Sequence, residues 1–251
     1  MVDKKDVKTL AVICARGGSQ RLKNKNLLLL NGKSLLQYVV EDAQKSNCVT
    51  NCCCTTDNKE IKELVNKLDM FVVNRPKEYA KDDSPIQNCV VHAVRMMELN
   101  LPFSWEEHKY DIVVILQGNI PFHKEGMIDN CVNTLILNWD SCSSVVTIKK
   151  TSETPYWVYK KNINNINTLF RAFKPDGVDV VRKQDTDAFF MLDGSVQAVK
   201  RDTLMSNKDC EGVHCYLGKN IIGILQERPY TLEIDDYWDY KFVKAIMEGK
   251  Q

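Results

Sequence analysis

The chain has 251 residues, of which 44% are hydrophobic and 27% are charged, a composition that permits a large buried core and excludes global disorder. Lysine and arginine (34) almost balance aspartate and glutamate (33), for a formal net charge of +1. This balance gives no reason to expect a nucleic-acid or membrane partner. A phosphate-bearing ligand must therefore be held by a local site.

The sequence carries no pattern typical of a membrane span or a secretory signal. No apolar run reaches the roughly 18 residues that span a bilayer, and residues 1–6 lead directly into a strand pattern. We expect a cytoplasmic protein with one domain over 1–251, and we assign its ten cysteines to a reducing compartment. Cys210, His214 and Cys215 resemble a metal cluster but lack a second ligand pair, so no structural metal is expected there.

The first half of the chain alternates strand and helix patterns at short spacing. Continuously apolar strands separated by helices indicate a three-layer α/β fold, a mostly parallel sheet with helices on both faces. Ligands of such sheets bind beyond the carboxyl ends of the strands, here the loops after Ala15, near Thr55 and after Leu116. We expect strands at 9–15, 49–55, 70–73 and 111–116, and helices beginning near Ser34, at Lys59 and at Pro85.

The second half is less regular. Residues from about 150 to 188 mix aromatic, basic and asparagine side chains and interrupt the alternating pattern. Two strands, at 188–200 and 217–225, and a last helix from about Tyr237 to Met247 are expected after this segment.

A basic, glycine-rich turn follows the first strand directly. Gly17 and Gly18 allow the backbone to turn tightly and to present N–H groups to an anion, while neighbouring cations would neutralise phosphate charge. Those cations are Arg16, Arg21, Lys23 and Lys25. A solvated basic turn is the alternative, and neither a P-loop nor a dinucleotide-binding glycine pattern fits these spacings.

Two acids precede the last helix. Glu233 and Asp235 project to the same side of an extended segment, because side chains alternate along it. Two carboxylates on one face favour a cation between them, and Mg²⁺ prefers such oxygen ligands. Helix capping by Asp235 or Asp236 is the alternative, and these residues alone leave both interpretations open.

Residues 15–26, ARGGSQRLKNKN, resemble the CTP-phosphate loop of the acylneuraminate cytidylyltransferase family, which makes CMP-activated sialic acids. Residues 32–36, 55–57 and 75–82 resemble further segments of that family in the same order. The resemblance covers most of the first half and weakens after residue 150. It implies a nucleotide-diphospho-sugar transferase-like fold and Mg²⁺-dependent transfer of CMP from CTP to an acidic sugar, with release of pyrophosphate.

The resemblance also implies roles for individual residues. The catalytic residues would be Arg16, Lys25 and Asp235. The nucleotide-binding residues would be Ala15, Arg16, Gly17, Gly18, Ser19, Lys25, Asn26, Arg75 and Ser84. Asp235 would hold Mg²⁺ together with Glu233, and the longer Glu233 side chain could act through water. For Arg75, a surface ion pair with Glu78 is the alternative.

The acceptor end departs from the family pattern. By resemblance, the acceptor-binding residues would be Gln117, Asn119, Arg182, Gln184 and Asp193. Met191 and Asp193 stand where the family often carries an arginine and an asparagine, and Trp157 takes the place of a lysine. We expect a nonulosonic acid such as a sialic, legionaminic or pseudaminic acid as acceptor, with Kdo (3-deoxy-manno-octulosonate) or a phosphonate as the alternative. A nucleotide-binding module without turnover is the alternative from a different class.

The segment at about 150–188 is expected to form a dimerisation and acceptor arm. Its aromatic residues are Tyr156, Trp157, Tyr159, Phe170 and Phe173. Aromatic side chains are enriched where interfaces bury apolar surface, and the resembling family forms dimers through an excursion at this point. We expect a homodimer whose arm closes over the acceptor pocket of its neighbour. The alternative is that these aromatic residues complete the core of their own chain.

Overall fold

A computed structural model of the protein describes residues 7–100, 109–161, 169–173, 182, 187–207 and 210–249. The strands are β1 (Thr9–Cys14), β2 (Leu29–Leu30), β3 (Lys33–Ser34), β4 (Asn51–Thr56), β5 (Phe71–Asn74), β6 (Ile112–Gln117), β7 (Ser144–Lys150), β8 (Tyr159–Lys161), β9 (Leu169–Arg171), β10 (Phe190–Lys200) and β11 (Ile221–Leu225). The α-helices are α1 (Leu35–Lys45), α2 (Lys59–Lys67), α3 (Ile86–Leu99), α4 (Met127–Leu137), α5 (Arg201–Ser206) and α6 (Tyr237–Glu248). Short 3-10 helices are η1 (Lys25–Leu27), η2 (Lys77–Tyr79), η4 (Pro155–Trp157) and η6 (Cys215–Leu217).

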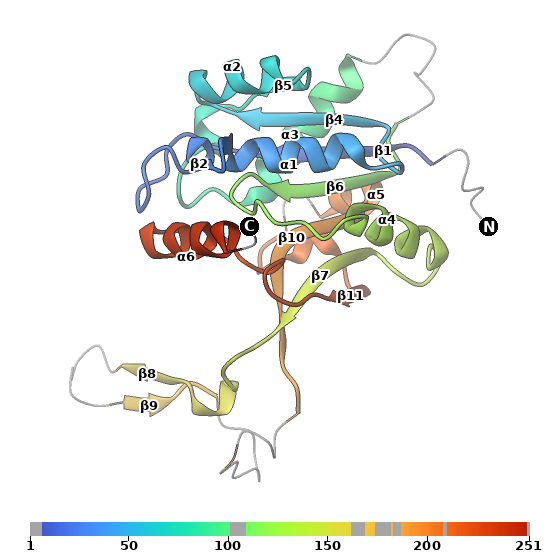
Figure 1. Cartoon of the computed structure of the whole chain (residues 1–251). Helices are drawn as coiled ribbons and strands as arrows, with labels where there is room; N and C mark the ends of the chain where they lie inside the picture. The colour runs from blue at the N-terminus through green and yellow to red at the C-terminus, as the bar shows by residue number, and fades with distance from the viewer. Residues whose placement is uncertain are drawn as a thin grey trace.

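A seven-stranded sheet forms the centre of the molecule, in the strand order β11-β7-β10-β6-β1-β4-β5 (Figure 1). Strand β10 runs antiparallel to both of its neighbours, and the other paired strands of this sheet run parallel. The expected mostly parallel α/β fold is therefore confirmed. Because β4 lies on one side of β1 and β6 on the other, the strand order reverses at β1, and in open α/β sheets such a reversal marks the ligand-binding crevice.

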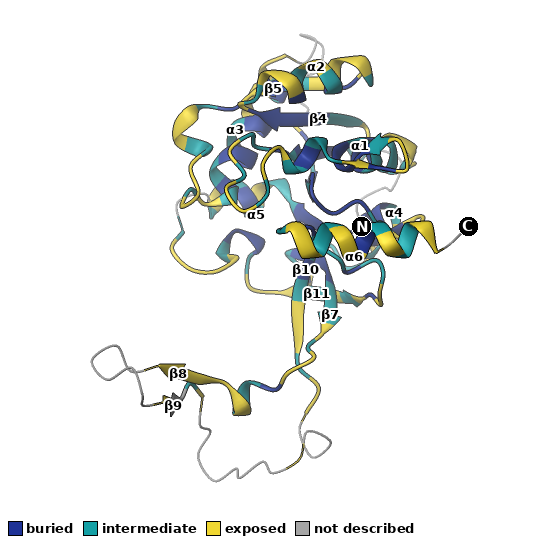
Figure 2. Ribbon diagram, turned by 60° about the vertical axis from the view of Figure 1, so that its left-hand side comes forward, coloured by how far each residue is buried: buried dark blue, intermediate teal, exposed yellow. Residues whose placement is uncertain are grey.

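The alternation of side chains along β1 explains the two layers of helices. Ala11 and Ile13 belong to the core that the sheet shares with α1, α2 and α4, whereas Leu10 and Val12 belong to the core that it shares with α3 and α5. All four side chains are fully buried, and the central strands are the most deeply covered part of the molecule (Figure 2).

The chain's last segment reaches the carboxyl edge of the sheet through a third, smaller core. Leu30 and Leu35 pack there against Ile234, which precedes α6, and against Val243 of α6. The backbone N–H of Ile234 also donates to the carbonyl of Asn119, just after β6, at 3.1 Å. These contacts fix the acidic segment 233–236 beside the ends of β1 and β6.

Between β7 and β10 the chain leaves the body and carries the two-stranded β8–β9 hairpin (Figures 1 and 2). At the base of this hairpin, the Tyr156 ring contacts Phe173 and Phe189, with centroids 5.7 and 5.5 Å apart. The excursion falls where the sequence predicts an arm.

Several element boundaries differ from the expectation by one to four residues. The strand expected over 217–225 begins only at Ile221, because 215–217 form η6 and Gly218 follows with φ 80°. Pro85 is the N-cap of α3, so the first helical residue is Ile86.

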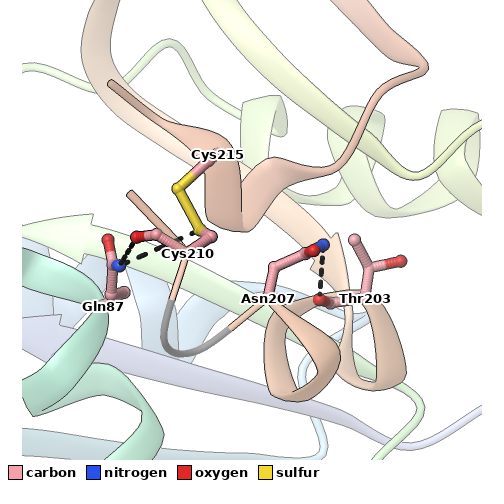
Figure 3. The surroundings of a disulfide bond; sticks show 5 residues. All are labelled: Gln87, Thr203, Asn207, Cys210 and Cys215. Atoms are coloured by element: carbon pink, nitrogen blue, oxygen red, sulfur yellow. Dashed lines mark hydrogen bonds between the residues drawn. A yellow bond between two sulfur atoms is a disulfide. The ribbon is translucent and has the colours of Figure 1, made fainter. Parts of the chain in front are cut away.

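The cysteines also differ from the expectation of a reducing environment. Cys210 and Cys215 form a disulfide, and the eight other cysteines are free thiols (Figure 3). The Gln87 amide donates to the Cys210 carbonyl at 3.2 Å, which joins the disulfide loop to α3. In the part of the chain that the structure describes, no three metal-ligating side chains gather, and no helix is long and apolar enough to cross a membrane.

Candidate active site

A cavity of about 250 Å³ opens at the carboxyl ends of β1, β5 and β6. Six residues expected to bind nucleotide line it, namely Arg16, Ser19, Lys25, Asn26, Arg75 and Ser84. On its wall also lie Gln117, Asn119, Glu233 and Asp235, which were expected at the acceptor and metal positions. Residues up to 219 positions apart in the chain, Arg16 to Asp235, thus share one site.

The turn after β1 is held from both sides. The Ala15 N–H donates to the Thr55 carbonyl at 3.2 Å, and the Gly17 N–H donates to Asp57 Oδ1 at 2.9 Å. On the other side, Asn26 Nδ2 donates to the Arg16 carbonyl at 3.1 Å. Ala15 and Gly17 therefore shape the turn, whereas Arg16, Ser19 and Lys25 present side chains to the cavity.

The Arg75 guanidinium occupies a buried position at the end of β4. Its Nη2 donates to the Thr55 carbonyl at 2.8 Å, and its side chain is only 8% exposed. The alternative of a surface ion pair with Glu78 is therefore wrong. A buried arginine anchored by a backbone carbonyl keeps its remaining donors in a fixed direction, here along the cavity wall.

The two candidate metal ligands converge on Asn119. Its Nδ2 donates to Glu233 Oε1 at 3.0 Å and approaches Asp235 Oδ1 at 3.4 Å. Asp235 also accepts from Lys25 Nζ at 2.7 Å and from Arg21 Nη2 at 3.0 Å. Burial alone would raise the pKa of Asp235, but the hydrogen bonds and charges of Lys25 and Arg21 outweigh it and lower that pKa.

Helix capping belongs to Asp236 and not to Asp235. Asp236 Oδ1 accepts from the N–H groups of Trp238 and Asp239 at the start of α6, and the Asp239 side chain bonds back to the Asp236 N–H. This capping box satisfies the exposed donors of the first turn. The Asp235 side chain is thus left to face the cavity.

Asp193 does not have the position expected of an acceptor ligand. Its side chain is 2% exposed, and both carboxylate oxygens accept hydrogen bonds from the protein. The donors are the Thr147 hydroxyl (2.5 Å), the Ser195 N–H (2.9 Å) and the Gln226 amide (2.8 Å). A carboxylate saturated in this way ties β10 to β7 and to the segment after β11, so the assignment of Asp193 to the acceptor is corrected to a structural role.

The other acceptor candidates separate into two groups. Gln117 and Asn119 line the cavity, whereas Arg182 is exposed on the arm. Gln184 lies outside the described residues.

Several cavity residues were not singled out from the sequence. Tyr79, Lys81 and Asp82 line the cavity, and Asp82 Oδ1 accepts from Arg16 Nη2 at 2.5 Å. Cys14, Ile86 and Cys89 also line the cavity. The segment 75–82 was recognised as a motif, and a rule that all its polar residues face the ligand would have found Lys81 and Asp82.

The cavity lies at the reversal point of a mostly parallel sheet and brings cations and carboxylates together, an arrangement typical of α/β proteins that bind phosphate-bearing ligands. A family model described as "Cytidylyltransferase" matches residues 10–246, and the chain belongs to this family.

Individual relatives match almost the whole length of this chain. The CMP-N,N'-diacetyllegionaminic acid synthase of Legionella pneumophila is 26% identical, with 98% of each chain covered. The N-acylneuraminate cytidylyltransferase of Escherichia coli is 23% identical over 97% of this chain and 53% of its own. A solved structure of CMP:2-keto-3-deoxy-manno-octonic acid synthetase complexed with CTP shares the fold, with a TM-score of 0.67, 17% identity, and 97% of this chain and 100% of its own covered.

Proposed function

We propose that the protein transfers CMP from CTP to a nonulosonic acid and releases pyrophosphate. The observation that carries the proposal is the convergence of Arg16, Lys25 and Arg75 with the paired acids Glu233 and Asp235 on one cavity. The names of two relatives, one of them matched over 98% of each chain, support the acceptor class. A cytoplasmic location stays a prediction.

The chemistry requires little covalent help from the protein. An acceptor oxygen attacks the α-phosphorus of CTP, and the bond to pyrophosphate breaks. Positioning of the reactants and cations placed where negative charge accumulates supply most of the acceleration in such transfers. Arg16 and Lys25 are the cations proposed to bind the departing pyrophosphate, and Arg75 is proposed to recognise the nucleotide.

Mg²⁺ is the proposed cofactor, and the residues present fit it. Glu233 and Asp235 supply hard carboxylate oxygens that both come within 3.4 Å of the Asn119 amide, and Mg²⁺ in nucleotide sites takes one or two carboxylates together with phosphate oxygens and water. The ion would neutralise phosphate charge in the transfer. Lys25 and Arg21 pair with Asp235 at the cavity wall.

The proposal is tested with nucleotide and acceptor panels. Calorimetric titration should give tighter binding for CTP than for ATP or GTP, because Arg75 and Asn26 are proposed to recognise cytidine. Pyrophosphate release with CTP and Mg²⁺ should then be stimulated by a sialic, legionaminic or pseudaminic acid. Equal binding of all three nucleotides would contradict the assignment of CTP as the nucleotide. Turnover with Kdo or a phosphonate alone would make that compound the acceptor. Nucleotide binding without turnover would identify the protein as a nucleotide-binding module.

A further inference from the structure

Two thiols face each other on the wall of the nucleotide cavity. Cys14 is the last residue of β1, and Cys89 lies in the first turn of α3, 75 residues further on. Their sulfur atoms are 3.8 Å apart, and both residues line the cavity. Neither thiol has a part in the proposed transfer of CMP, so the pair is a nucleophilic site that this reaction does not use.

The surroundings of the two sulfurs are unequal. The hydrogen bond from Cys14 lowers the pKa of Cys89 to about 7 against the opposing effect of burial, and the Arg75 guanidinium and backbone N–H groups of α3 add to the lowering. The same hydrogen bond and burial raise the pKa of Cys14. These surroundings favour ionisation of Cys89 over that of Cys14, whose sulfur lies within reach of it.

Other cysteines of the core lack these features. Burial raises the pKa of Cys52 to about 11 and that of Cys54 and Cys131 to about 12. Thiols that stay protonated react slowly with oxidants. Compared with these three cysteines, the cavity pair combines a close thiol partner with a lowered pKa at one of its two sulfurs.

We propose that Cys14 and Cys89 form a redox-active dithiol that a peroxide oxidises to a disulfide, and that nucleotide bound in the cavity protects it. The Cys89 thiolate attacks a peroxide oxygen, which breaks the O–O bond and gives a sulfenic acid and hydroxide. The Cys14 sulfur then attacks the Cys89 sulfur and displaces the hydroxyl group, which leaves as water with the Cys14 proton. The two thiols lose two electrons in total, and hydrogen peroxide takes them to become two waters.

Formation of this bond changes the cavity itself. A disulfide requires the sulfur atoms to approach to about 2.0 Å, from 3.8 Å in the dithiol, so the end of β1 and the start of α3 must adjust. Arg16 lies two residues after β1 and Ser84 two residues before α3, and both line the cavity. Oxidation should therefore weaken CTP binding, and reduction with dithiothreitol should restore it.

The test maps the oxidised bond directly. Wild-type protein is treated with hydrogen peroxide, its remaining thiols are blocked, and the digest is analysed by mass spectrometry for a Cys14–Cys89 peptide pair. The Cys210–Cys215 link, which is already formed, is the internal control. If only nucleotide-free protein reacts, CTP at ten times its dissociation constant should slow formation of the link about tenfold.

Variants separate the pair from the remaining cysteines. Cys89→Ser should abolish the new link, whereas Cys48→Ser, a partly buried thiol outside the cavity wall, should leave its rate unchanged. No Cys14–Cys89 link in the wild-type protein, or links that form elsewhere first, would overturn the proposal.

The protective effect of CTP rests on the proposed function, whereas oxidation of the Cys14–Cys89 pair is independent of that function. CTP binding to the reduced protein is measured separately by calorimetry. If CTP does not bind, the nucleotide site and its protective effect are both wrong. The mapped Cys14–Cys89 link still tests whether the two thiols form a redox-active pair. Binding without any slowing of oxidation would overturn protection alone.

Discussion

Asp235 and Asp236 are neighbours in the chain but serve different structural purposes. Asp236 caps α6, whereas Asp235 turns to the cavity and pairs with Lys25 and Arg21. The difference follows from the extended backbone at this point, which sends successive side chains to opposite sides. Each role can be removed without the other.

Asp235→Asn removes one anionic metal ligand and keeps the side-chain size. We expect turnover to fall at least about a hundredfold, because electrostatic stabilisation borne by a metal is worth several kcal/mol. The rate of pyrophosphate release over a Mg²⁺ titration measures the effect, and thermal unfolding should show a nearly unchanged fold.

Asp236→Ala is the matched control for this variant. Loss of an N-cap should lower the free energy of unfolding by about 0.5–2 kcal/mol, with turnover within a few-fold of wild type. Unchanged turnover in Asp235→Asn would remove Asp235 from the proposed metal site.

At the scale of elements, the phosphate turn and α2 depend on one another. The Asn58 side chain caps α2 by accepting from the Ile61 N–H at 3.0 Å, and it lies directly over Gly17. A Cβ atom on Gly17 would stand 2.6 Å from Asn58 Cβ, whereas a Cβ on Gly18 would meet nothing within 4 Å. Of these two glycines, only Gly17 is therefore required by a close approach.

Gly17→Ala should consequently displace Asn58 and weaken both the turn and the helix cap. We expect the free energy of unfolding to fall by about 1–3 kcal/mol, the usual cost of overpacking. Gly18→Ala, the adjacent control, should stay within about 0.5 kcal/mol. Urea unfolding followed by circular dichroism compares the two, and equal stabilities would mean that Asn58 moves aside without cost.

Elements with continuous local patterns could be predicted from the sequence. The apolar runs of β1, β4 and β6 were recognised, together with the rule that places ligands at their carboxyl ends. The disulfide loop was not, because nothing in the local pattern before β11 indicated that 215–217 would form a 3-10 turn and bring Cys215 to Cys210.

The site was predictable where motifs are local and not where partners are distant. The turn at 16–19 and the acids at 233–235 carry their own pattern. Asp193 took its partners from positions 46 and 33 residues away, Thr147 and Gln226, and only the folded sheet shows that these partners saturate it. The same holds for Cys14 and Cys89.

For the whole molecule, the arm leaves apolar surface in solvent. Trp157, Tyr159 and Phe173 are 42%, 50% and 49% exposed. The alternative that the arm's aromatic residues complete the core of their own chain is therefore wrong for these three. Large exposed aromatic groups on a projecting hairpin favour a protein interface, and dimerisation through the arm stays our prediction.

Sedimentation equilibrium should give a species of twice the 28.8 kDa chain mass at micromolar concentration. Trp157→Ser combined with Tyr159→Ser should shift the species to the monomer mass, because aromatic groups that become buried on association dominate the binding energy of such interfaces. Leu137→Ser, which changes an exposed apolar residue of the body (68% exposed), should leave the dimer intact. A wild-type protein that sediments at the monomer mass would show that the arm does not dimerise.

A two-fold dimer whose arm reaches the neighbour's cavity predicts complementation between damaged chains. An Asp235→Asn chain lacks the proposed metal ligand, and an Arg182→Ala chain lacks a cation of the exposed arm, so each homodimer should be impaired. In a mixed dimer with shared sites, one site receives both defects and the other receives none. Random exchange makes half of the dimers mixed, so activity should recover to about a quarter of the wild-type value per chain. Pyrophosphate release measures the recovery after native mass spectrometry has established exchange, and no recovery in exchanged dimers would confine each site to a single chain.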